Sequence, residues 1–173
     1  MEPSRELNVL GEGWTRESDD GPRRWKGMRV AGDQLGASLY ELAPGDAMHF
    51  HYHLGREELL IVLSGRLWLR TGDGWRELPE GEVAAFPRGQ RGAHGFENRS
   101  NDPVRVLVVS EQNAPNVSVY PDENRVGIFD APHPQDRRFG AVFDVDDAID
   151  DYGGGRAAIV PPGSGSTGSS SGG

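Results

Sequence analysis

The chain has 173 residues and a formal net charge of −9, with 17 arginines against a single lysine, Lys26, and no cysteine. This length suits one domain with a substantial core, and the arginines form no dense basic run, so nucleic acid is not an expected partner. The lack of cysteine excludes disulfides, thiolate ligands and a cysteine nucleophile. The N-terminus has no apolar signal core and no apolar run approaches ~18 residues, so we expect a cytoplasmic protein and no membrane partner.

From Trp25 to Ser110, short runs rich in β-forming residues alternate with Gly, Pro and Asp. This pattern predicts an all-β sandwich or small barrel without a core helix. Turns are expected at Pro44-Gly45, Ser64-Gly65 and Gly72–Gly74. The predicted strands are Arg24–Val30, Ala37–Ala43, Met48–His53, Glu58–Leu63, Arg66–Thr71, Trp75–Leu78, Glu82–Phe86, Ala93–Asn98 and Val104–Ser110.

Three histidines and one glutamate can meet at one point of this barrel. His51 and His53 lie on the same face of a strand, about 6.5 to 7 Å apart along it. A short connection returns Glu58 beside them, and His94 can close the site from across the barrel. Three neutral imidazoles and a carboxylate suit one divalent Mn, Fe, Co, Ni, Cu or Zn ion and leave positions open for a substrate or oxygen.

Strand parity also predicts the walls of the cavity around this site. His49 shares the parity of His51 and His53, so we expect it to contact a substrate near the rim rather than to ligate the metal. Three apolar residues have the parity of Glu58 or His94 and are expected to make the cavity mostly apolar: Leu60, Val62 and Phe96.

Two arginines, Arg88 and Arg91, lie in the loop before His94. They are either solvated or able to reach an anionic substrate at the mouth of the barrel.

The spacing of the site residues resembles the two sequence motifs of the cupin superfamily. The first motif is matched at Gly45, His51, His53, Glu58 and Gly65. The second is matched at Gly81, Pro87, Gly89, His94 and Asn98, although four residues separate Gly89 from His94 where the pattern usually has two. The resemblance covers roughly residues 36–111.

This resemblance implies a cupin double-stranded β-helix, or jelly-roll barrel, with irregular extensions. We expect an N-terminal extension with at least one strand over 1–35, the barrel core over 36–111, and a C-terminal extension over 112–162. Within the last, Val117–Tyr120 is expected as an edge strand or as one exchanged in a homodimer, and Asp144–Asp151 as a solvated helix or loop. Residues 163–173 have the composition of a flexible linker.

The resemblance also implies a range of functions. A metal-dependent enzyme acting on a small oxygenated metabolite is expected, dioxygenase-like first and isomerase or lyase second, with Glu58 serving as catalytic base as well as ligand. The alternative is a cupin that binds a small ligand or metal as a sensor or carrier without catalysis. One fold supports many activities, so the sequence leaves this choice open.

Overall fold

The computed structural model describes residues 6–20, 23–131, 137–148 and 159. These residues form thirteen strands and two short 3₁₀ turns, η1 (Gln90–Gly92) and η3 (Val145–Asp147), and contain no α-helix. None of the described segments is a helix long and apolar enough to cross a membrane.

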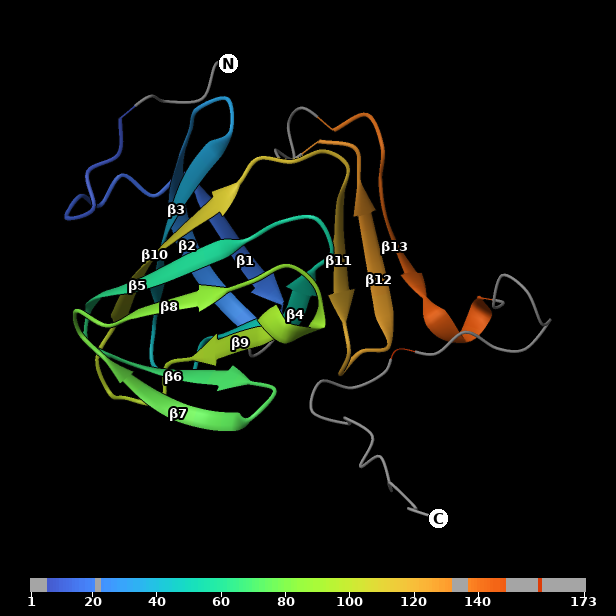
Figure 1. The fold of residues 1–173 in the computed structure, drawn as a ribbon. Helices are drawn as coiled ribbons and strands as arrows, with labels where there is room; N and C mark the ends of the chain where they lie inside the picture. The colour runs from blue at the N-terminus through green and yellow to red at the C-terminus, as the bar shows by residue number, and fades with distance from the viewer. Residues whose placement is uncertain (1–5, 21–22, 132–136, 149–158, 160–173) are drawn as a thin grey trace, which may run out of the picture.

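Two antiparallel sheets face each other and enclose the core (Figure 1). The first sheet has the order β1-β2-β3-β10-β5-β8, in which β1, β2 and β3 are consecutive and the later neighbours are distant in sequence. Its strands are β1 (Arg16–Asp20), β2 (Arg23–Ala31), β3 (Leu35–Leu42), β5 (Glu58–Ser64), β8 (Val83–Phe86) and β10 (Val104–Glu111).

The second sheet has the order β13-β12-β11-β4-β9-β6-β7. Its strands are β4 (Ala47–His53), β6 (Arg66–Thr71), β7 (Gly74–Pro79), β9 (His94–Glu97), β11 (Asn116–Tyr120), β12 (Arg125–Phe129) and β13 (Gly140–Asp144). Chain segments cross repeatedly between the two sheets, which is the arrangement of the predicted jelly roll.

The space between the sheets is filled mainly by aliphatic side chains. Leu42, Leu67, Leu69 and Leu78 are fully buried there. Asn98 is 1% exposed, and its Nδ2 donates to the carbonyls of Leu42 (3.0 Å) and Asp102 (2.7 Å). Asn98 therefore holds buried backbone groups.

A β-bulge changes the parity of β4 just before the candidate site. Met48 is opposite Phe96 on β9 and His51 is opposite His94, so three steps along β4 match two steps along β9. One extra residue therefore lies between Met48 and His51, and the strand no longer alternates regularly.

The C-terminal extension completes the second sheet. Strands β11, β12 and β13 lie side by side at one flank of the barrel (Figure 1). β11 pairs with both β12 and β4 of the same chain, with Ser118 opposite His53. The predicted strand Val117–Tyr120 is thus an interior strand and not an edge strand, because β12 and β13 cover its outer side.

The acidic segment from Asp144 lies only partly within the described residues. Its start ends β13 and forms η3, where Val145 is buried. Asp144 accepts a hydrogen bond from Arg125 (2.8 Å), and Asp146 accepts one from Asn124 (2.9 Å). Residues 149–151 of this segment and the predicted linker at 163–173 lie outside the described residues.

Candidate metal centre

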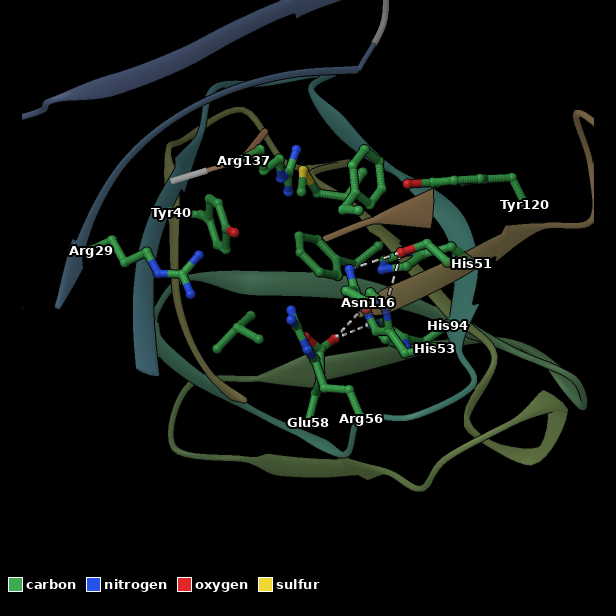
Figure 2. Close-up of a pocket in the computed structure, with 15 residues that line it drawn as sticks. Arg29, Tyr40, His51, His53, Arg56, Glu58, His94, Asn116, Tyr120 and Arg137 are labelled. Atoms are coloured by element: carbon green, nitrogen blue, oxygen red, sulfur yellow. Dashed lines mark hydrogen bonds and ion pairs between the residues drawn. The ribbon is translucent and has the colours of Figure 1, made fainter. Parts of the chain in front are cut away.

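The four predicted ligands come together from three strands (Figure 2). His51 and His53 are on β4, Glu58 begins β5, and His94 begins β9. Ligand atoms of His51, His53 and Glu58 all lie within 4.8 Å of one another. His94 joins them through Glu58, whose Oε2 is 3.4 Å from Nε2 of His94 and 3.4 Å from Nε2 of His53.

The protein orients all three imidazoles through their Nδ1 atoms. Nδ1 of His51 is 2.9 Å from the carbonyl of His49, and Nδ1 of His94 is 2.8 Å from the carbonyl of Gly92. A carbonyl can only accept a hydrogen bond, so both Nδ1 atoms donate and both Nε2 atoms carry a lone pair in the neutral rings. Nδ1 of His53 is 3.0 Å from Oγ of Ser118, which can accept in the same way.

The extra residues of the second motif are accommodated in η1. Gly89 begins this turn with a φ of 76°, and its N–H donates to the carbonyl of His53 (2.7 Å). At Gly92 an added Cβ would lie 1.8 Å from the carbonyl oxygen of Pro87, so no larger residue fits. The tight turn returns the chain to β9 with His94 stacked on Phe86, at a ring separation of 3.7 Å.

Glu58 and His51 have the charge states that metal ligands require. Burial raises the pKa of Glu58, but hydrogen bonds and charge from His53 and His94 outweigh it and hold that pKa well below its usual range. Burial, together with the neighbouring His94 and His53, lowers the pKa of His51 to about 3. An ionised carboxylate and a neutral imidazole therefore face each other at neutral pH.

These donors fit one transition-metal ion. Two ligand atoms that each lie about 2.0–2.2 Å from one ion can be 3.4 Å apart, which is the distance of Oε2 of Glu58 from Nε2 of His53 and from Nε2 of His94. Lone pairs of imidazole and carboxylate repel each other unless a proton or a cation lies between them. Hydrogen bonds on the far side of ligating histidines are also typical of metal sites.

A cavity of about 270 Å³ lies against these ligands. Its other polar walls are supplied largely by residues that neither motif specifies: Arg29, Tyr40, Arg56, Asn116, Tyr120 and Arg137. Phe96 contributes to the lining, as predicted. The lining is therefore much more polar than the mostly apolar cavity expected from the sequence.

His49 does not reach this cavity. Its Nδ1 is 2.8 Å from Oε1 of Glu123, and its ring packs edge-on against Tyr120. The bulge in β4 puts Met48 into the lining in place of His49. One extra residue in the strand thus leaves His49 outside the lining of this cavity, and its expected contact with a substrate stays a prediction.

Leu60 and Val62 point into the barrel, but they are part of the hydrophobic core and not of the cavity wall. They are 0% and 1% exposed and pack with the leucines of the opposite sheet. The cavity occupies only the end of the barrel near Glu58, because the level of Leu60 and Val62 is filled by side chains.

The two loop arginines also lie away from the cavity lining. Arg88 pairs with Glu111, with an Nη2–Oε1 distance of 2.6 Å, and Arg91 is exposed in η1. The strong pairing of Arg88 raises its pKa. Of the two alternatives stated for these arginines, their exposed positions agree with the solvated one.

Sequence reasoning missed the residues that the extensions bring to the site. Arg29 comes from β2, and Asn116, Ser118 and Tyr120 come from β11. The alternation of Asn116, Ser118 and Tyr120 along a predicted strand was a usable signal, because these residues share one face. No local pattern, however, indicates that this face meets His53.

Known proteins similar to this chain were found by sequence and by structure. The chain is 34% identical over 94 residues to the tetracenomycin polyketide synthase protein TcmJ of Streptomyces glaucescens, a match that covers 54% of this chain and 59% of that protein. The chain thus spans less than two thirds of that relative.

Two solved structures illustrate the structural likeness. A sugar phosphate isomerase of the cupin superfamily from Silicibacter pomeroyi superposes with a TM-score of 0.69 at 26% identity, covering 83% of this chain and 94% of that one. The polyketide cyclase RemF from Streptomyces resistomycificus superposes with a TM-score of 0.50 at 20% identity, covering 62% and 79%. The latter supports the fold alone.

Residues 38–110 match the family model for the cupin domain. This range contains all four predicted ligands and the strands that carry them. With the jelly-roll topology and both motifs in place, residues 38–110 form a cupin domain.

Proposed function

We propose that this protein is a metal-dependent enzyme that acts on a small oxygenated metabolite. The observation that carries the proposal is the convergence of three oriented imidazoles on the ionised carboxylate of Glu58, beside a cavity of about 270 Å³. His51, His53, Glu58 and His94 would hold one divalent transition ion. Such an ion, when bound, polarises a substrate oxygen as a Lewis acid.

The residues around this centre have separate proposed tasks. Glu58 is the candidate catalytic base as well as a ligand, because its carboxylate is ionised and faces the cavity. Burial raises the pKa of Tyr120, so its hydroxyl stays protonated and can donate a hydrogen bond to a substrate oxygen. Asn116 and Ser118 hold the ring of His53 in place.

Isomerase or lyase chemistry is our first candidate reaction class. It is supported by the polar cavity and by the similarity to the sugar phosphate isomerase from Silicibacter pomeroyi, which extends over nearly the whole of that structure. Dioxygenase-like chemistry is the second candidate, because a set of three histidines and one glutamate also suits iron, nickel, copper and manganese. A cupin that binds a ligand without turnover is the competing class.

The first experiment is metal analysis by inductively coupled plasma mass spectrometry after reconstitution with each of Mn, Fe, Co, Ni, Cu and Zn. We expect near-stoichiometric metal in the wild type and in His49→Ala, and its loss in His51→Ala. His49 is a matched control because it lies on the same strand but faces Glu123. Protein that stays empty with every ion would refute the enzyme proposal.

A second experiment separates the reaction classes. Metal-loaded protein is incubated in D₂O with a panel of small hydroxy-ketones, keto acids and sugar phosphates. Deuterium incorporation at carbon without oxygen uptake identifies isomerase or lyase chemistry, whereas oxygen consumption identifies an oxygenase. Either activity should disappear in Glu58→Gln, and saturable binding with neither activity would favour the non-catalytic class.

A further inference from the structure

Three arginines are among the residues that line the cavity: Arg29, Arg56 and Arg137 (Figure 2). Among the described residues that line it, Glu58 supplies the only carboxylate. Although the chain as a whole carries a net charge of −9, this cavity is therefore locally positive. A concave site with an excess of one charge concentrates ligands of the opposite charge.

Arg56 is the most informative of the three. It lies in the connection between β4 and β5, where Leu54, Gly55 and Glu57 are exposed, yet Arg56 itself is folded inward and only 7% exposed. Within the part of the chain that the structure describes, its buried Nε and Nη2 atoms have no hydrogen-bond partner. A buried, charged donor without an acceptor costs free energy, so a structural role alone does not account for it.

The chemistry of a guanidinium defines what could satisfy these atoms. Burial lowers the pKa of Arg56, but an arginine remains protonated in proteins. Its planar fork of donors matches the oxygens of a carboxylate or a phosphate. The other two arginines already have protein contacts, Arg29 with Gln112 and Arg137 with the carbonyl of Ala131 and the ring of Phe129.

We propose that Arg56, flanked by Arg29 and Arg137, binds an anionic group of the substrate, either a carboxylate or a phosphate, while other substrate oxygens face the metal centre. This inference rests on the proposed function, because it takes the cavity beside His51, His53, Glu58 and His94 as the active site. It assigns the recognition of an anion to residues that neither motif specifies, and not to the loop arginines Arg88 and Arg91.

The test is isothermal titration calorimetry of metal-free, full-length protein with inorganic phosphate and, separately, malonate. Saturable binding of at least one anion is expected, and Arg56→Gln should weaken it about tenfold or more because a bidentate, charge-assisted contact is lost. Arg56→Lys keeps the positive charge but lacks the planar pair of donors, so its affinity for the anion should lie between those of the wild type and Arg56→Gln. Arg88→Gln also removes one positive charge, but from the protein surface, and should bind the anion with the affinity of the wild type.

The outcomes separate this inference from the proposed function. Tighter binding of phosphate would identify a phosphorylated substrate, and tighter binding of malonate a carboxylate. If neither anion binds, or if Arg56→Gln binds both as tightly as the wild type, the inference is overturned even when the metal is retained. If the anions bind through Arg56 while the protein takes up no metal, the proposed function fails and the anion site stands.

Discussion

Oγ of Ser118 lies 3.0 Å from Nδ1 of His53, although 65 residues separate them in the chain. Ser118 also receives a hydrogen bond from Nδ2 of Asn116 (3.3 Å). Both residues belong to β11, which lies beyond the matched cupin domain at 38–110. The C-terminal extension is therefore a part of the candidate site and not only an addition to the barrel.

Removal of the Ser118 hydroxyl should weaken metal binding. Loss of an outer hydrogen bond to a ligating histidine typically lowers metal affinity about 10–100-fold, so we expect a loss of this size in Ser118→Ala. Competition with a chromophoric chelator measures it. Ser64→Ala, at the far end of the strand that begins with Glu58, should have no effect, and equal affinities for the two variants would show that Ser118 does not act on His53.

Asn98→Ala should destabilise the barrel without changing the ligands. The substitution leaves the buried carbonyl of Leu42 without this donor, and an unsatisfied buried group costs about 1–3 kcal/mol. Urea unfolding measures the difference. Asn113 is exposed and makes one contact, to the carbonyl of Gly55, so Asn113→Ala should change the free energy of unfolding by no more than about 0.5 kcal/mol.

Glu41 should make the free energy of unfolding depend on pH in the acid range. Burial raises its pKa, but hydrogen bonds from Lys26 and Arg105 outweigh burial and lower it below 4.5. Because the folded pKa is the lower one, the contribution to stability is fully present above the unfolded value and is lost as pH falls through the folded value. It is therefore complete at neutral pH.

Urea unfolding of the wild type and Glu41→Gln from pH 7 to about pH 3 tests this expectation. The two free energies should differ most at neutral pH and converge in acid. Glu77, paired with Arg66 on the surface, provides the control: Glu77→Gln should show little change at any pH, because exposed ion pairs contribute little. A constant difference between the wild type and Glu41→Gln would contradict the prediction.

The homodimer implied by the cupin resemblance remains a prediction. Exposed apolar side chains on the outer face of the first sheet are a candidate for its interface. Leu59 on β5 and Val83 on β8 are 44% and 55% exposed, and their strands are neighbours at the sheet edge. Light scattering should give a dimeric mass for the wild type and a monomeric mass for the Leu59→Glu/Val83→Glu double variant. Leu54→Glu, an equally exposed loop position, should stay dimeric.

The sequence by itself determined the barrel and its ligands, because both depend on local rules. Alternation and turn residues predicted the strands, and the spacing of His51, His53, Glu58 and His94 predicted their convergence, which the structure shows. Such spacing is informative because a strand has a fixed rise per residue, so the number of residues between two positions gives the distance between them.

Only the tertiary structure decided what surrounds those ligands. One extra residue in β4 replaced His49 by Met48 in the cavity, and strand periodicity gives no sign of a bulge. Ser118 reaches the site through the pairing of β11 with the distant strand β4, and no local pattern specifies such a pairing. Arg56 turns inward from a short connection whose neighbours are exposed, and no local sequence pattern specifies that orientation.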